Sequence, residues 1–122
     1  MATLESLVRT ALAAESTVTD LVSTRIYCNE LPQNPTLPAI VYTTFTDEYQ
    51  TLEETTETGT IQIDSFGTRH SSEHISLRAP IKTAMKNAAN LISIYNGHQS
   101  RNPEDSIDAE REILSFVVHY TP

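Results

Sequence analysis

Three prolines within seven positions constrain the fold of this chain more than any other feature of its sequence: Pro32, Pro35 and Pro38. Proline fixes φ and has no backbone N–H, so residues 31–38 are excluded from a helix and from most ladder pairing. We therefore expect a stiff, extended connector that delivers the chain to the next strand. The alternative interpretation is a proline-rich ligand recognised by a partner domain.

Before the connector, apolar residues recur at the spacing of helices. The first helix has one apolar face, formed by Leu4, Leu7, Val8, Ala11 and Leu12. A second, shorter helix has on one side Val18, Leu21 and Val22. Thr3 is the expected N-cap of the first helix, and Thr17 with Asp20 fits a loose capping pattern for the second.

The connector is followed by two segments typical of strands, residues 39–46 and 59–67. In the second segment two isoleucines alternate with Gln62 and Asp64, which predicts one face in the core and one face in water. Residues 47–58 between the segments are polar and acidic. We expect an antiparallel hairpin with a long, mobile connection.

A central helix is predicted from about Ser71 or Ser72 to about Asn90. Its buried stripe consists of Leu77, Ile81, Ala84, Met85 and Ala88. Pro80 lies inside this pattern and predicts a kink or a late start. Two further strands are expected at residues 91–95 and 112–120, and Asn96-Gly97 is a turn signal after the first of them.

The order of these elements predicts the fold class. A chain of 122 residues forms one domain, here residues 1–122. Helix, short helix, two strands, helix and two strands predict an α+β fold. Its economical packing is a four-stranded, mainly antiparallel sheet with helices packed on one face.

The charge and hydropathy of the chain exclude some classes of function. The net charge is −8, so the protein should repel phosphate, although DNA can pass an acidic surface without sticking to it. No apolar run approaches the roughly 18 residues needed to span a membrane. Residues 1–5 lack the basic and apolar regions of a secretory signal, so we expect no membrane association and synthesis in the cytoplasm.

One motif suggests metal chemistry. His70-Ser71-Ser72-Glu73-His74 matches the H-x-x-E-H pattern of inverted zinc peptidases. That chemistry needs both histidines on one face of a helix and a third ligand, whereas His70 is expected to precede the helix. A small zinc-dependent hydrolase is therefore a distant alternative, and two surface histidines are the simpler interpretation.

The remaining candidates for catalysis are weak. Cys28 is the only cysteine, and no histidine with an orienting group is specified beside it, so we expect a small, partly buried thiol. The chain has only 3 glycines and no phosphate-binding loop. We expect no enzymatic activity, no catalytic residue, no metal site and no cofactor.

Two groups of charged residues are more informative. The connection between the first two strands holds five acids and no base: Asp47, Glu48, Glu53, Glu54 and Glu57. The central helix repeats a basic residue every four positions, at Arg78, Lys82 and Lys86. Both groups can be solvated surface. Alternatively, the acidic connection meets basic groups of a neighbouring copy or partner and sets register.

The order of several segments resembles the tail-completion, or tail-terminator, proteins of long-tailed bacteriophages. The most specific segments are Arg25-Ile26-Tyr27, Leu31-Pro32-Gln33 and Leu37-Pro38-Ala39-Ile40-Val41-Tyr42. Ile61-Gln62-Ile63-Asp64-Ser65-Phe66 and the last strand, residues 114–120, follow in the same order. The chain departs from the family pattern where members often carry glycine, at Ser23-Thr24, and proline, at Cys28.

The resemblance implies a structural protein of the virion. Such proteins form a ring, typically a hexamer, at the head-proximal end of the tail tube. The ring ends polymerisation of the tail tube protein and joins the tail to the head-tail connector protein, while DNA passes through its lumen. The nearest alternative is a head-completion or neck connector protein.

Overall fold

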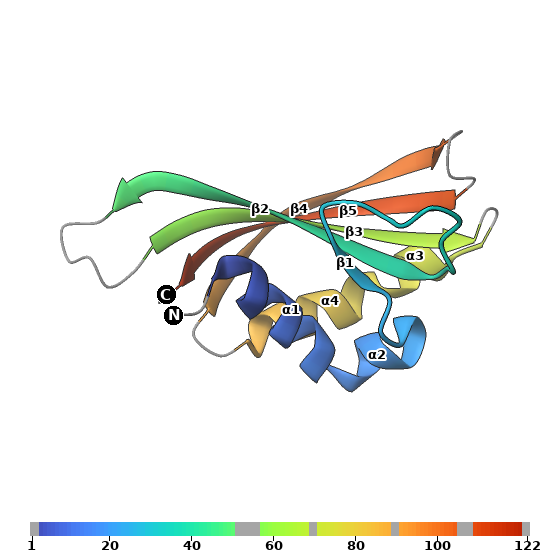
Figure 1. The fold of residues 1–122 in the computed structure, drawn as a ribbon, viewed down its shortest axis with the longest axis horizontal. Coiled ribbons are helices and arrows are strands. Elements are labelled where there is room, and N and C mark those ends of the chain that lie inside the picture. Colours follow the sequence, from blue (N-terminus) through green and yellow to red (C-terminus); the bar gives the residue numbers. More distant parts are fainter. Residues whose placement is uncertain (1–2, 51–56, 69–70, 89–90, 105–108, 121–122) are drawn as a thin grey trace.

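A computed structural model describes residues 3–50, 57–68, 71–88, 91–104 and 109–120 of the chain. It shows two layers, a twisted β-sheet with helices on one of its faces (Figure 1). The helices are α1 (Leu4–Ala14), α2 (Ser16–Val22), α3 (Glu73–Ser76) and α4 (Arg78–Lys86). The strands are β1 (Ile26–Cys28), β2 (Ala39–Gln50), β3 (Glu57–Thr68), β4 (Leu91–Glu104) and β5 (Ala109–Tyr120).

The sheet has the strand order β1-β2-β3-β5-β4. Its four long strands pair antiparallel, which confirms the predicted α+β class with helices on one face. The three-residue strand β1 adds a parallel edge, with Ile26 opposite Ile40 and Cys28 opposite Tyr42. Three residues are too few to show strand periodicity, so the sequence gives no signal for β1.

The first helix is capped as predicted. The Thr3 hydroxyl accepts a hydrogen bond from the Ser6 backbone N–H, and the Ser6 hydroxyl accepts one from the Thr3 N–H. The predicted cap of α2 is wrong, because this helix begins at Ser16 and the Thr17 hydroxyl donates to Glu15 Oε2. The helix ends at Val22, and its C-cap Ser23 has a φ of 55°, which explains why glycine suits this position.

Pro80 gives the central helix its predicted late start. The segment is divided into α3 and α4 at Leu77. Pro80 is the third residue of α4, in the first turn, where the missing N–H has no helical partner to lose. The predicted stripe is confirmed: Leu77, Ile81, Ala84 and Met85 are buried, and Ala88 packs against them.

The strands are longer than predicted. Strand β2 continues to Gln50 and β3 begins at Glu57, so the connection is shorter than the expected 47–58. Strand β4 runs through Asn96-Gly97 without a turn. Gly97 has a φ of 126° and the register shifts between Tyr95 and Gly97, so the dipeptide supplies a β-bulge and not the predicted turn.

The sheet has an apolar cluster on each face. The larger cluster lies between the helices and the sheet, around Phe116 and Leu114 of β5. The smaller one, on the opposite face, consists of Val41, Phe66 and Ala109, packed against Tyr27, Leu31 and Leu37. The proline-rich connector has no helix or strand, as predicted, and its leucines cover part of the face that the helices leave open.

Candidate interaction surfaces

The three basic residues of α4 have different surroundings: one pairs with a buried carboxylate, and two are exposed. The Arg78 guanidinium binds the Glu112 carboxylate, with Nη2 2.6 Å and Nε 2.8 Å from Oε1. Glu112 is completely buried on β5, where a carboxylate needs a partner of opposite charge. Lys82 and Lys86 are exposed. Of the three predicted interaction residues, Arg78 therefore has a role inside the protein.

Lys82 and Lys86 flank a pocket of about 290 Å³ between α4 and the sheet. We call it the lysine pocket; its lining is Lys82, Thr83, Lys86, Tyr95 and Phe116. The Lys82 Nζ lies 4.1 Å from the centroid of the Tyr95 ring, and that ring packs at 5.5 Å on Phe116. Among the described residues, neither ammonium group has a carboxylate partner. The pocket thus presents two positive charges beside an aromatic wall.

The five predicted acidic residues do not form one loop. Asp47 and Glu48 belong to β2 and Glu57 belongs to β3, whereas Glu53 and Glu54 lie outside the described residues. The ends of β2 and β3 that carry these acids extend past the helical layer (Figure 1). The negative charge is therefore carried on a projecting β-hairpin.

A hydrogen bond ties the first helix to this hairpin. The Thr44 hydroxyl of β2 donates to Glu5 Oε1 of α1 at 2.7 Å. The bond lowers the pKa of the Glu5 carboxyl because it stabilises the charged form. Sequence reasoning placed Glu5 in the first turn of a helix, but a contact across 39 positions has no local signal.

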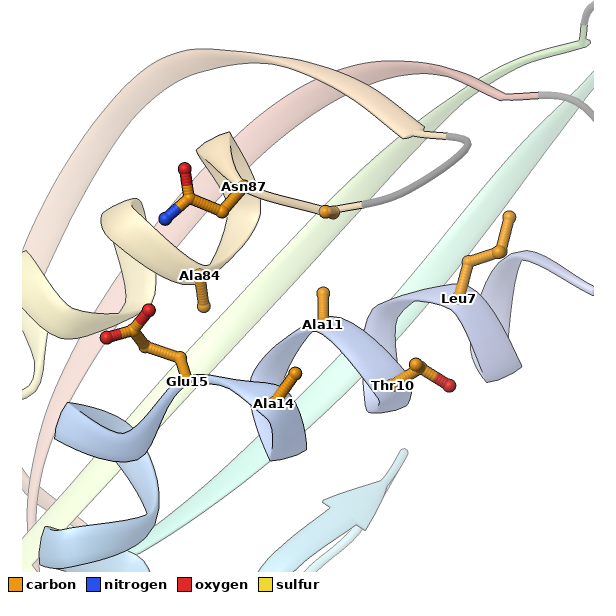
Figure 2. Close-up of a pocket in the computed structure, with 8 residues that line it drawn as sticks. Leu7, Thr10, Ala11, Ala14, Glu15, Ala84 and Asn87 are labelled. Carbon is orange, nitrogen blue, oxygen red and sulfur yellow. The ribbon is translucent and has the colours of Figure 1, made fainter.

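A groove lies between α1 and α4 on the side of the helices that faces away from the sheet (Figure 2). Its volume is about 290 Å³, and its lining is Leu7, Thr10, Ala11, Ala14, Glu15, Ala84, Asn87 and Ala88. Half of these residues are alanines, which allow the two helices to approach each other closely. Helical periodicity predicted Ala11, Ala84 and Ala88 as core positions but gave no indication of a groove.

The zinc-motif residues serve local structure. The Glu73 carboxylate accepts a hydrogen bond from the Thr68 backbone N–H at 2.7 Å. Hydrogen bonds from the side chain and then the backbone of Thr68 lower the pKa of Glu73. His74 is buried, and its carbonyl accepts a hydrogen bond from the Ser65 hydroxyl at 2.7 Å. His70 lies outside the described residues, and the described ones contain no group of three possible metal ligands.

Two side chains differ from expectation in their burial. Cys28 is exposed and not partly buried, because β1 is an edge strand. Asp64 is 4% exposed and not on a wet face. It is paired with the Arg111 guanidinium and accepts a hydrogen bond from Gln62 Nε2 at 3.0 Å. The second apolar cluster, which the sequence did not reveal, covers this end of the open sheet face.

The pKa of the Tyr42 hydroxyl is also shifted by its surroundings. Tyr42 lies opposite Cys28 in the pairing of β1 with β2. Burial is the main cause that raises the pKa of Tyr42, and the neighbouring Cys28 adds to it. The arrangement provides no base for the thiol, so it does not indicate a nucleophile.

Comparison with known proteins identifies the family. The longest described helix, α1, has 11 residues, and no helix in the described ranges is both long and apolar enough to cross a membrane. A search of curated proteins finds no match. The family model described as "Tail completion protein gp17" matches residues 6–105, a region that extends from α1 to the end of β4. The chain belongs to this family of phage tail completion proteins, a component of the virion tail.

Proposed function

We propose that the protein forms a ring, typically a hexamer, at the head-proximal end of the tail tube. The ring ends polymerisation of the tube and joins the tail to the head-tail connector. The family match over residues 6–105 is the observation that carries this proposal. The function is mechanical, since it requires contacts between chains and no chemical reaction.

The negative charge of the protein supports a role next to DNA that involves no tight binding of DNA. The net charge of −8 repels phosphate on average, so DNA in a lumen built from these chains is not retained by counterion release. A basic lumen would instead slow the passage of the genome. The acidic balance is compatible with a conduit.

The charged surfaces supply contacts between chains. The acids of residues 47–57 are Asp47, Glu48, Glu53, Glu54 and Glu57. The exposed cations beside the lysine pocket are Lys82 and Lys86. Opposite charges on separate surfaces of one subunit favour head-to-tail association, and they set register and association rate more than affinity.

Tail length tests the proposal. Phage that lack the protein should make overlong tail tubes, and the wild-type chain supplied in trans should restore normal length. Electron microscopy of the lysates measures both outcomes. Tails of normal length that remain unattached to heads would instead assign the protein to the head side of the neck and contradict tube termination.

A further inference from the structure

Within the part of the chain that the structure describes, two edges of the sheet at the same end of the molecule have no further strand beside them. Strand β1 pairs only with residues Ile40–Tyr42 of β2, so the segment Thr43–Gln50 has no described strand on its outer side. Strand β4 forms the other edge of the sheet and pairs with β5 alone among the described strands. Both edges present backbone N–H and C=O groups that can accept another strand.

The two edges lie at the same level of the sheet. Ser93 of β4 is opposite Val118, Val118 is opposite Gly59, and Gly59 is opposite Thr46 of β2. In the same way, the register connects Leu91 through Tyr120 and Glu57 to Gln50. A rotation about an axis along the strands therefore brings Leu91–Tyr95 of one copy beside Thr43–Gln50 of the next, without a shift along the axis.

Strand direction is also compatible with this arrangement. Strands β2 and β5 each pair antiparallel with β3, so they run in the same direction, and β4 runs opposite to β5. Rotation about an axis along the strands preserves their directions. The β2 strand of the next copy therefore meets β4 in antiparallel orientation, the pairing with which most of this sheet is built.

Protective features are confined to the other half of β4. The half beyond Tyr95 contains Arg101 and Pro103 and has register shifts at Tyr95/Gly97 and Arg101/Glu104. Charges, proline and bulges are common means of blocking edge pairing. The segment Leu91–Tyr95 reads Leu-Ile-Ser-Ile-Tyr, with no charge and no proline. Only this half of the edge suits a new strand.

Charge and apolar surface indicate a second copy as the occupant. Lys82 and Lys86 flank the lysine pocket, whose wall includes Tyr95 of β4, so positive charge lies beside this edge. The β2 segment carries Asp47 and Glu48. Phe45 on the same segment is 55% exposed, and association removes its apolar surface from water.

We propose that Leu91–Tyr95 of β4 pairs with Thr43–Gln50 of β2 in the next copy, which continues the sheet across the subunit boundary. This inference rests on the proposed ring and specifies how neighbouring copies contact each other. The two acids on β2 oppose pairing of β2 with β2 by like-charge repulsion. A β4 to β4 pairing would instead close a dimer and leave no edge for a ring.

Single-cysteine variants distinguish these pairings. With Cys28→Ser as background, Thr46→Cys and Ser93→Cys chains are purified separately, mixed, assembled on tail tubes of the phage that encodes the chain, and oxidised. Opposed residues of antiparallel strands lie within disulfide reach. We expect mixed dimers from the mixture and none from either variant alone. Dimers from Ser93→Cys alone, or from Thr46→Cys alone, would overturn the head-to-tail pairing.

The same assay separates this inference from the proposed function. Binding of the chains to tubes without any mixed dimer overturns the strand pairing and leaves the proposed function standing. Failure to bind tubes contradicts the proposed function itself. Ser115→Cys mixed with Thr46→Cys is the matched control, since Ser115 lies on the interior strand β5 and should give no mixed dimer.

Charge exchange provides a second readout that does not depend on the register. Lys82→Glu with Lys86→Glu should weaken association with assembled copies by about tenfold, the effect of two exposed charge pairs. Adding Asp47→Lys and Glu48→Lys to the same chain should restore association, because the two edges again differ in the sign of their charge. A loss without restoration, with circular dichroism showing folded chains, contradicts attraction between the charges of these two edges.

Discussion

The two halves of the sheet differ in how far other parts of the chain cover their edges and outer face. In the half that contains Ile40–Tyr42, strand β1 covers the edge of β2. Leucines of the proline-rich connector cover the sheet face opposite the helices. Two ion pairs, Arg78–Glu112 and Asp64–Arg111, lie in the same half. In the half that contains Thr43–Gln50, no described strand pairs on the outer side of β2 or of β4, and Phe45 is exposed. We call these the closed half and the open half.

The difference indicates how one small chain separates folding from assembly. Two buried carboxylates paired with arginines and a double apolar layer fix the closed half, because removing the arginine leaves a buried charge. The open half keeps its surface available for other copies. Substitutions in the closed half should therefore change the free energy of unfolding, and those in the open half should change association.

Arg78→Ala should have the largest effect on stability. The substitution leaves the fully buried Glu112 without this partner and should lower the free energy of unfolding by about 3 kcal/mol. Lys82→Ala on the same helix is the matched control, and the loss of its contact with Tyr95 should cost less than about 1 kcal/mol. Urea unfolding followed by circular dichroism measures both. Equal losses would remove the distinction between the two halves.

Gly67→Ala tests the closed half through packing alone. A Cβ at this position would lie 2.6 Å from the His74 backbone nitrogen and 2.9 Å from the Glu73 Cβ, so α3 must move. We expect a loss of about 2 kcal/mol in the free energy of unfolding. Thr60→Ala in the open half should change it by no more than about 0.5 kcal/mol. A tolerated Gly67→Ala would show that α3 is not held against β3.

The closed half also shows where sequence reasoning fails. Periodicity predicted the apolar stripes of α1 and α4 because each repeats over two or more turns. It placed Asp64 in water, since alternation along one strand cannot reveal that leucines from the connector return to cover the far face. From the sequence, Glu112 is expected to be the polar first residue of a strand. It is buried instead, because Arg78, 34 positions away, pairs with its carboxylate.

For the open half, the sequence shows which residues are charged but not the geometry of the strands that carry them. The acidic group and the lysines are visible in the sequence, because charge needs no fold to be counted. Strand ends are set by pairing with neighbours, so the extension of β2 to Gln50 and of β4 through Gly97 was missed. The groove between α1 and α4 depends on contacts between segments far apart in the chain and has no local signal.

Neutralising the acids of residues 53–57 should weaken association and leave folding unchanged. Glu53→Gln, Glu54→Gln and Glu57→Gln in one chain should leave the free energy of unfolding within about 0.5 kcal/mol of wild type. Association on tail tubes should weaken by about tenfold, or about 1.4 kcal/mol. Sedimentation with tubes measures association, and urea unfolding measures stability. Unchanged tube binding and normal tail joining would remove the acids from the assembly surface.

The smallest expected effect compares one carboxylate from each half. The hydrogen bond from Thr44 lowers the pKa of Glu5, and the bonds from Thr68 lower the pKa of Glu73. A lowered folded-state pKa stabilises the protein above the ordinary value of 4.5 and loses that contribution as the pH falls through the folded value. Both groups are partly exposed, so each contributes less than about 1 kcal/mol at neutral pH.

Thr44→Val removes the hydroxyl donor and should raise the pKa of Glu5 towards its ordinary value, without moving that of Glu73. The variant should be slightly less stable than wild type at neutral pH, and the difference should vanish as the pH falls through the folded pKa of Glu5. NMR titration of both carboxylates measures the shifts. If both pKa values moved together, the two halves would be coupled through the fold. Assembly at the open half would then also change the surroundings of residues in the closed half.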